Sequence, residues 1–200
     1  MENVELPFKI PYGDILIHAG DFTNYGEVDK VKEFNTWLGT LPHTHKIVIA
    51  GNRDFSFDTS MVGPDWKHWD KIQHPDVKHV KSMLTNCIYL EDTSVTIEGI
   101  KFYGTPWTNS RSNIREEGFK IPISDVEKWE EVCSSIPSDT DILISHCPPL
   151  GIRDVNSHGQ MCGSELLLKH VVERIKPRYH IFGHIHEGTN FYIIAICFVI

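Results

Sequence analysis

Short apolar runs alternate with amphipathic stretches along most of this 200-residue chain. Residues 14–19 (DILIHA) and 47–50 (IVIA) are almost continuously apolar, as expected of strands buried on both faces of a sheet. Between them, apolar residues recur at intervals of three and four, which predicts a helix that ends before Pro42. Those apolar residues are Val28, Val31, Phe34, Leu38 and Leu41.

The pattern changes twice in the following hundred residues. Residues 55–85 are polar and weakly periodic, which predicts a loop with one helix. Residues 87–107 contain CIYL, SVTI and IKFYG and predict a series of short strands joined by hairpins. Ser124 and Glu127 have the spacing of a capping box and predict a helix that continues to about Cys133. The remaining expected elements are a strand at 142–145, a helix at 165–175 and a strand at 179–182.

This order of elements predicts a fold class. Strands that alternate with helices, interrupted by a β-rich stretch, indicate a layered α/β architecture with one mixed sheet or two sheets. The length suits a single domain over residues 1–200, without an internal repeat or a linker. The last ten residues, FYIIAICFVI, are half the ~20 that a membrane-spanning helix needs, and they predict a buried strand instead.

The charge balance limits the class of partner. The chain has 27 acidic and 19 basic residues and a formal net charge of −8. Long nucleic acids are bound largely through Lys and Arg, so no long nucleic acid is expected as a partner. A small phosphorylated substrate stays compatible with this charge, because bound metal ions can supply positive charge.

Cysteine usage and the first residues indicate the compartment. The five cysteines form no CxxC pair, and an odd number of them favours free thiols in a reducing compartment. The first residues, MENVELPFKIPYGD, have neither the basic nor the apolar region of a secretory signal. We therefore expect a cytoplasmic protein that does not associate with membranes.

Polar residues of the kind that bind metals follow four of the predicted strands. Gly20-Asp21 and Gly51-Asn52 follow the first two, His146 follows residues 142–145, and Gly183-His184-Ile185-His186 follows residues 179–182. Ligands bind at the carboxyl ends of strands in open α/β sheets, so these side chains are expected to converge. Together they form a mixed oxygen and nitrogen ligand set that suits Zn, Mn or Fe. Each motif alone is weak evidence, but four in order make a strong combination.

The motifs GDFTNYG, GNRD, SHCPP and GHIHEG resemble, in order and spacing, the signature blocks of calcineurin-like metallophosphoesterases. The longer segments PYGDILIHAGDFT, KIVIAGN, YGTPWT, CPPLGIRD and IFGHIHEG are similar to the metallophosphoesterase-domain-containing proteins of the fetal brain type. The resemblance extends over residues 11–188. It implies a β-sandwich flanked by helices, with divalent metal ions at the strand ends.

The resemblance also implies roles for individual residues. Asp21 would bridge two metals, Asn52, His146 and His184 would complete the second site, and His186 would belong to the first. Asn52, Arg53 and His184 are the catalytic candidates. Mn, Zn or Fe, one or two ions per chain, would activate a water molecule for attack on phosphorus. Arg53 and Trp107 are the candidate substrate-binding residues, although a structural aromatic is the favoured interpretation of Trp107.

The chain departs from the family pattern in three places. The Asp-x-His motif that usually supplies the first metal does not occur before Asp21, and neither Asp14 nor His18 replaces it; His18 is expected to be a core histidine. Arg53 stands where the family commonly has His, and it cannot donate a proton; it is expected either to clamp a phosphate or, equally, to be an ordinary surface arginine of the loop. Asp54 is expected to form a local pair or to lie in solvent. The fold is expected to lack its first and last strands, as in a domain truncated at both ends.

The favoured function is a metal-dependent phosphoric ester hydrolase, acting as a phosphodiesterase on cyclic or small nucleotides. The alternative is a catalytically impaired metal- or nucleotide-binding protein, because Asp-x-His is absent and Arg53 replaces His. A truncated product that folds poorly is a third possibility. The oligomeric state is left open. The histidines outside the motifs are expected at the surface or in loops, namely His43, His45, His68, His74, His79, His158, His170 and His180.

Overall fold

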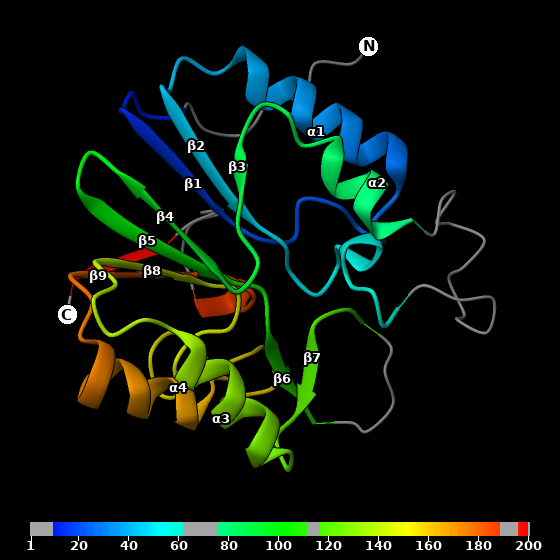
Figure 1. Cartoon of the computed structure of the whole chain (residues 1–200). Coiled ribbons are helices and arrows are strands. Elements are labelled where there is room, and N and C mark those ends of the chain that lie inside the picture. The colour runs from blue at the N-terminus through cyan, green and yellow to red at the C-terminus, as the bar shows by residue number, and fades with distance from the viewer. Residues whose placement is uncertain (1–9, 62–75, 112–116, 189–195, 200) are drawn as a thin grey trace.

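Two β-sheets pack face to face in this computed structural model, and helices cover both outer faces (Figure 1). The structure describes residues 10–61, 76–111, 117–188 and 196–199. Helices α1 and α2 lie beside the smaller sheet, and α3 and α4 lie beside the larger one (Figure 1). The predicted layered α/β class is therefore confirmed, in the form of a β-sandwich flanked by helices.

The smaller sheet contains three parallel strands in the order β1-β2-β3. Strand β1 is Ile15–Ala19, β2 is His45–Ile49 and β3 is Ile88–Tyr89. Helix α1 (Val28–Thr40) connects the first two strands and ends before Pro42, as its apolar spacing predicts. Because β1 and β2 are parallel and in register, their carboxyl ends lie next to each other.

The larger sheet has the order β10-β9-β8-β5-β4. Its strands are β4 (Thr93–Ile97), β5 (Ile100–Thr105), β8 (Ile142–Ser145), β9 (Tyr179–Phe182) and β10 (Ile196–Val199). Strands β5, β8 and β9 are parallel, and β4 and β10 run antiparallel to their neighbours. The predictions for β8 and β9 are correct to the residue, and the strand expected among the last ten residues is present as β10.

The other elements agree less closely with the predictions made from the sequence. The segment 55–85 contains helix α2 (Val77–Ser82) and a short 3₁₀ helix, Phe55–Phe57, and its residues 62–75 lie outside the described part of the chain. Strands β6 (Thr108–Ser110) and β7 (Lys120–Pro122) form a small parallel sheet that the sequence pattern did not predict. Three residues per strand are too few to produce a recognisable alternation.

Helices α3 and α4 pack against the outer face of the larger sheet. The predicted capping box at the start of α3 (Val126–Ser135) is wrong, because the N-cap is Asp125, whose carboxylate accepts a hydrogen bond from the Lys128 amide. Helix α4 (Glu165–His170) continues as a π-helical segment, Val171–Ile175. Lys176 in the left-handed conformation then ends the helical segment.

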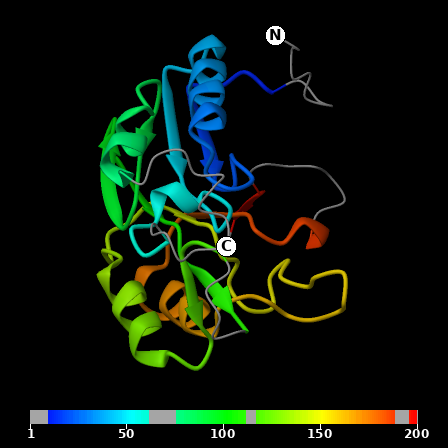
Figure 2. The same cartoon turned by 90° about the vertical axis from the view of Figure 1, so that its right-hand side faces the viewer.

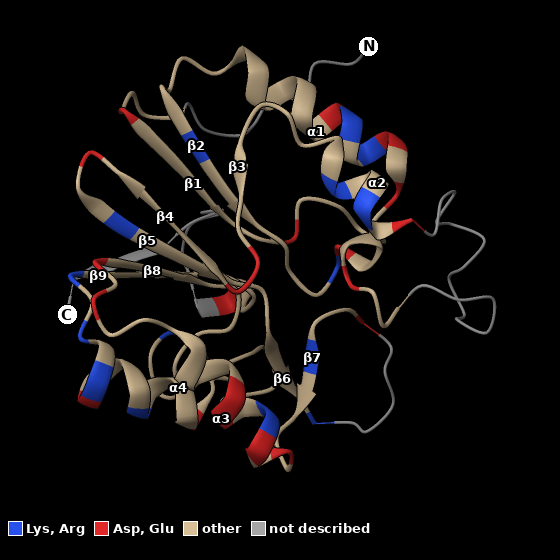
Figure 3. Cartoon of the chain, viewed as in Figure 1, with Lys and Arg blue, Asp and Glu red and all other residues tan. Residues whose placement is uncertain are grey.

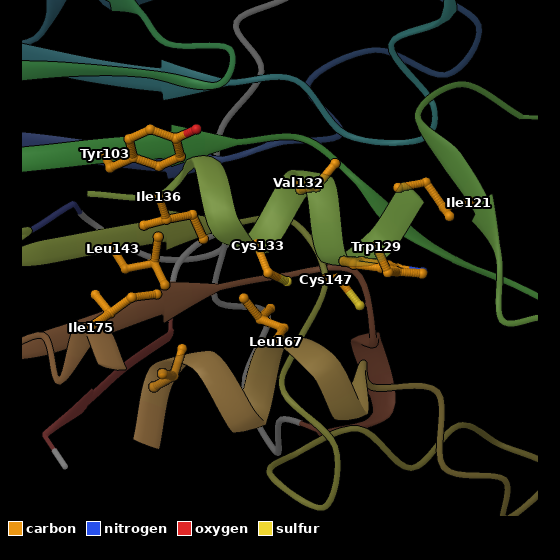
Figure 4. Packing of buried hydrophobic residues seen from close by; sticks show 11 residues of the cluster. Tyr103, Ile121, Trp129, Val132, Cys133, Ile136, Leu143, Cys147, Leu167 and Ile175 are labelled. Atoms are coloured by element: carbon orange, nitrogen blue, oxygen red, sulfur yellow. The ribbon is translucent and has the colours of Figure 1, made fainter. Parts of the chain in front are cut away.

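The core is divided between the layers. One cluster fills the space between the two sheets and includes Ile49, Phe102 and Ile144. Another lies between the larger sheet and its helices, where Cys133 of α3 and Leu167 of α4 point toward each other (Figure 4). These two layers fix the carboxyl ends of β1, β2, β8 and β9 relative to one another.

Charge lies mainly on the helices and loops, whereas the strands are largely uncharged (Figure 3). The loop between β8 and α4, drawn in yellow, projects from the side of the molecule (Figure 2). Among the described residues, none of the helices is both long enough and apolar enough to cross a membrane.

Candidate metal centre

Four polar side chains meet where β1, β2, β8 and β9 end. Potential ligand atoms of Asp21, His146 and His184 all lie within 4.8 Å of one another. The Oδ1 atom of Asn52 lies 2.9 Å from Nε2 of His146 and adds a fourth group. The structure therefore brings together one residue from each of the four strand-end motifs.

The backbone at the strand ends makes this approach possible. Gly20 has a φ of +98°, and a Cβ atom there would lie 2.6 Å from Nδ1 of His146. A Cβ atom on Gly51 would lie 2.4 Å from Oδ1 of Asp21. Both separations are shorter than atoms tolerate, so glycine at these two positions lets the two loops close around the side chains.

The ring of His146 is held in one orientation. Its Nδ1 atom lies 2.7 Å from the carbonyl oxygen of Ala19, which can only accept a hydrogen bond, so Nδ1 carries the hydrogen. This leaves Nε2 facing Asn52 and Asp21, whose Oδ2 is 3.4 Å away. A histidine fixed through one nitrogen and directed with the other toward oxygen ligands has the arrangement usual for metal-binding imidazoles.

The protonation states of the group also suit a cation. Burial alone would lower the pKa of His146, but the neighbouring Asp21 carboxylate outweighs it and raises that pKa. Burial opposes ionisation of Asp21, yet His146 and the Arg53 backbone hold the pKa of Asp21 well below its usual range. Burial, together with the charge of His146 and Lys120, lowers the pKa of His184 well below its ordinary value. A carboxylate and a neutral imidazole are therefore present at neutral pH.

These residues fit the divalent metal that the sequence implies. One carboxylate, one amide oxygen and two imidazoles form a donor set that suits Zn, Mn or Fe. Binding through Nε2 requires the neutral ring of His146, so a metal ion would compete there with a proton, whose binding Asp21 favours by raising the pKa of His146.

Asp54 connects the two loops that carry the oxygen ligands. Its Oδ2 accepts hydrogen bonds from the amides of Asp21 (2.9 Å) and Gly51 (2.8 Å). Its Oδ1 accepts from the amide and the hydroxyl of Thr23, at 2.9 and 2.7 Å. The side chain is fully buried, so the expectation of a local pair or of solvent is wrong. Hydropathy could not indicate this role, because the four donors come from the folded loops.

Burial is the largest influence on the pKa of Asp54. It raises that pKa to about 7, and the nearby Asp21 carboxylate adds to the increase. Hydrogen bonds from Thr23 and Gly51 act in the opposite direction and favour the ionised form. Asp54 is thus a buried acid whose charge depends on the backbone of both loops.

The other predicted site residues lie at different distances from this group. The Arg53 amide donates to Oδ1 of Asp21 at 2.8 Å, while its half-exposed side chain reaches Glu117. The indole N–H of Trp107 donates to Asp92 at 2.7 Å, and its ring packs edge-on against Phe119. His186 is exposed, begins a 3₁₀ turn, and is not among the three residues grouped around Asp21.

Several other histidines are not where the sequence placed them. His18 is buried, as predicted for a core histidine, and its Nδ1 accepts from the Gly20 amide at 3.3 Å. His170 in α4 and His180 in β9 are buried, which contradicts the prediction of a surface or loop position, whereas His43 is buried but lies in a loop. His45, His79 and His158 are at least partly exposed, and His68 and His74 lie outside the described residues.

Residue His180 supports the segment that carries His146. Its Nε2 lies 2.8 Å from the hydroxyl of Ser145, and this hydroxyl donates to the carbonyl of Cys147 at 2.6 Å. The hydroxyl hydrogen is used for Cys147, so Nε2 of His180 acts as the donor to Ser145. Sequence alternation gave no indication of this contact.

Comparison with known proteins gives consistent results. Residues 5–188 match the family model described as calcineurin-like phosphoesterase. Metallophosphoesterase domain-containing protein 1 of Homo sapiens is 45% identical over 192 residues, covering 91% of this chain and 57% of the relative. A UPF0046 protein of Caenorhabditis elegans is 41% identical over 206 residues, covering 96% and 70% respectively. The chain thus spans less than two thirds of the human protein's length.

One solved crystal structure supports the fold. It aligns with a TM-score of 0.52 at 17% sequence identity and covers 79% of this chain and 57% of that chain. At this identity the likeness concerns the fold alone.

Proposed function

Because the chain belongs to the calcineurin-like phosphoesterase family, we propose that it is a metal-dependent phosphoric ester hydrolase. The observation that carries this proposal is the convergence of Asp21, Asn52, His146 and His184 at the ends of four strands. Family membership makes a phosphoric ester the expected substrate class. The ionised Asp21 and the neutral His184 supply the forms that bind a cation at neutral pH.

Each of these residues has a defined task in the proposal. Asp21, Asn52, His146 and His184 would hold the ion, and a bound divalent ion would polarise the phosphoryl group and acidify water. Hydrogen bonding to Ala19 keeps Nε2 of His146 directed at the centre. Asp54 holds the loops of Asp21 and Asn52 at a fixed separation.

The guanidinium of Arg53 would bind the phosphoryl oxygens. Its backbone is fixed by Asp21, while its side chain is half exposed beside the cluster. Arginine stays protonated at neutral pH, so Arg53 can stabilise negative charge but cannot protonate a leaving group. Of the two substrate-binding candidates we retain Arg53, because Phe119 and Asp92 already engage the ring and N–H of Trp107.

We propose a cyclic or small nucleotide as the substrate, manganese as the activating ion and a cytoplasmic location. The net charge of −8 is consistent with a small anionic substrate that meets a local cation, and it disfavours long nucleic acids.

A second candidate is a metal- or nucleotide-binding protein without turnover. It is favoured by one specific observation, namely that the position expected to supply acid catalysis is occupied by Arg53, whose side chain is paired with Glu117. Binding to the native state alone would raise the free energy of unfolding by about 2.7 kcal/mol at a hundredfold excess of ligand over the dissociation constant.

Metal content and turnover should be measured on the same folded sample. We expect manganese-dependent hydrolysis of a bis-aryl phosphodiester, and we expect Asp21→Ala to weaken metal binding by about a hundredfold or more. His158→Ala is the control, because His158 is an exposed residue of the projecting loop. Bound metal without turnover, combined with stabilisation by nucleotide, would select the second candidate. A folded protein that binds neither metal nor nucleotide would contradict both candidates.

A further inference from the structure

Three charged side chains lie beside the metal cluster and contact one another. The Glu117 carboxylate is 3.6 Å from Nε of Arg53 and 3.1 Å from Nζ of Lys120. The three side chains are 27%, 48% and 16% exposed, respectively. One carboxylate therefore neutralises two cations at a position that solvent can reach. We refer to Arg53, Glu117 and Lys120 as the charged triad.

The backbone holds this triad against the candidate metal ligands. The Gly118 amide, next to Glu117, donates to the carbonyl of Asn52 at 3.0 Å. The Phe119 amide donates to Oδ2 of the buried Asp58 at 2.7 Å. Lys120 begins β7, which pairs in register with β6. The triad is therefore attached to the same loop that carries Asn52.

The ammonium group of Lys120 has a second fixed contact. It lies 3.2 Å from the carbonyl oxygen of Asn109 in β6, so its position does not depend on Glu117 alone. Its positive charge also contributes to the lowered pKa of His184, after burial and the charge of His146. Lys120 thus acts electrostatically on the metal cluster, although sequence reasoning did not select it.

The Glu117 carboxylate places negatively charged oxygens between two cations, as a bound phosphoryl group would. Phosphoryl oxygens are bound preferentially by the fork of an arginine and by the point charge of a lysine. Partly exposed ion pairs contribute little to stability, so an anionic ligand with more negative oxygens can displace the carboxylate.

We propose that Arg53 and Lys120 form an anion subsite for the phosphoryl group of the substrate, and that Glu117 occupies this subsite until the substrate binds. This inference deepens the proposed hydrolase function and rests on it for the identity of the anion. Lys120 is then a substrate-binding residue, and Glu117 is an internal competitor that weakens the binding of poorly charged ligands. The segment before β7 and β7 itself carry both signs of charge (Figure 3).

A purely structural ion network is the competing interpretation. In that case Glu117 would simply hold the start of β7, and the removal of its charge would loosen the loop without improving anion binding. The two interpretations predict opposite changes in affinity for Glu117→Gln. Glu117→Gln is therefore more informative than a substitution that removes the charge of Arg53 or Lys120.

The test uses inorganic phosphate as the probe and isothermal titration calorimetry on the metal-loaded protein. Lys120→Met keeps the length of the side chain and removes the charge, and we expect it to weaken phosphate binding by about tenfold. Glu117→Gln should strengthen phosphate binding by about threefold, because the competing charge is gone. With the bis-aryl substrate, the same variants should change KM in the same directions and leave kcat nearly unchanged.

Lys101→Met is the matched control. Lys101 forms a comparable pair with Asp139 at 2.7 Å, but at the opposite end of β5 from the cluster. It should change neither phosphate affinity nor KM. Cooperative thermal unfolding of every variant would show that the loop and the fold are retained.

The outcomes separate this inference from the proposed function. If the wild type hydrolyses nothing but Lys120→Met weakens and Glu117→Gln strengthens phosphate binding, the subsite is supported while hydrolysis is rejected. If the wild type is active but the two variants change neither phosphate affinity nor KM, the subsite is rejected while the hydrolase stands. Weaker phosphate binding by Glu117→Gln would also overturn the subsite and support the structural network.

Discussion

The two sheets supply different ligands to the candidate metal centre and hold them by different forces. The smaller sheet provides the oxygen ligands Asp21 and Asn52, whose loops are joined by the buried carboxylate of Asp54. The larger sheet provides the imidazoles of His146 and His184, which follow strands packed in an apolar layer. The Asp54 carboxylate, which accepts four hydrogen bonds, positions the ligand loops of the smaller sheet. Contacts between uncharged side chains position the histidines of the larger sheet.

This difference predicts which kind of change will destabilise each sheet. Removal of Asp54 leaves the amides of Asp21, Gly51 and Thr23 without this acceptor, while the Thr23 hydroxyl keeps a 3.4 Å contact with the carbonyl of Arg53. Removal of one neutral contact in the larger sheet leaves its apolar packing in place. The smaller sheet should therefore be sensitive to the loss of a single side chain, and the larger sheet to protonation of a buried base.

The strongest test of the comparison is Asp54→Ala. We expect the free energy of unfolding to fall by about 3 to 5 kcal/mol, because several buried donors lose a charged acceptor. Asp54→Asn should cost less, since the amide keeps one acceptor oxygen but presents N–H groups to two of the donors. Urea denaturation measured by circular dichroism gives both values.

The control for this prediction is Asp139→Ala. The side chain of Asp139 is 73% exposed and forms an ion pair with Lys101, so its loss should change the unfolding free energy very little. If Asp54→Ala were as stable as Asp139→Ala, the buried carboxylate would not organise the smaller sheet.

Acidification tests the larger sheet through His180. Burial lowers the pKa of His180 from 6.5 to about 3. Between these values the unfolded chain binds the proton and the folded protein does not, so stability falls as the pH falls below 6.5. Lowering the pH from 7 to 5 should remove about 2 kcal/mol through this residue. Urea denaturation at both pH values should show a loss about 2 kcal/mol smaller in His180→Leu than in the wild type, because His18 and His184, whose pKa values are also lowered, contribute equally to both proteins.

The comparison between variants is needed because Asp54 acts with the opposite sign. Its pKa is raised from 3.8 to about 7 by burial, so the folded protein binds the proton more readily and gains stability on acidification. His158→Gln serves as the control, because His158 is exposed. An equal loss of stability in the wild type and in His180→Leu would show that His180 is not held neutral.

The smallest expected effect is that of Ser145→Ala. The buried hydroxyl bridges His180 and the carbonyl of Cys147, beside the candidate ligand His146. Its loss should cost about 1 kcal/mol of stability and weaken metal binding by at most about tenfold. Calorimetric titration with manganese, alongside Ser134→Ala on the exposed face of α3, gives the comparison. If Ser145→Ala lowered the unfolding free energy as much as Asp54→Ala does, the two sheets would not differ in their dependence on a single side chain.

The fold was largely predictable, because its elements are defined by apolar residues. The strands at 142–145 and 179–182 were predicted to the residue, since each is a short apolar run bounded by polar positions. Parallel pairing places Asp21 beside Asn52 at the end of the smaller sheet and His146 beside His184 at the end of the larger sheet, and the packing of the two sheets brings these pairs together. The order of the strands therefore allowed the linear motifs to predict which side chains meet at the site.

What the sequence did not predict depends on polar side chains inside the fold. Asp54 and His180 are buried because folded neighbours offer donors and acceptors, and hydropathy does not record such partners. The N-cap of α3 is Asp125 and not Ser124. This shift of one residue depends on the geometry of the loop before the helix. Lys120 was missed because β7 is too short to show a pattern.

The arrangement of ligands along the chain has a consequence for protein synthesis. The ribosome releases β1, β2 and β3, and with them Asp21 and Asn52, long before it releases His184 beyond β9. A nascent chain can therefore present the oxygen half of the centre while Ile49 of the inner sheet face still lacks its apolar partners from the larger sheet. Binding of a metal ion by all four candidate ligands would therefore require His184 to have left the ribosome, and until then the smaller sheet would expose the apolar face that a chaperone can protect.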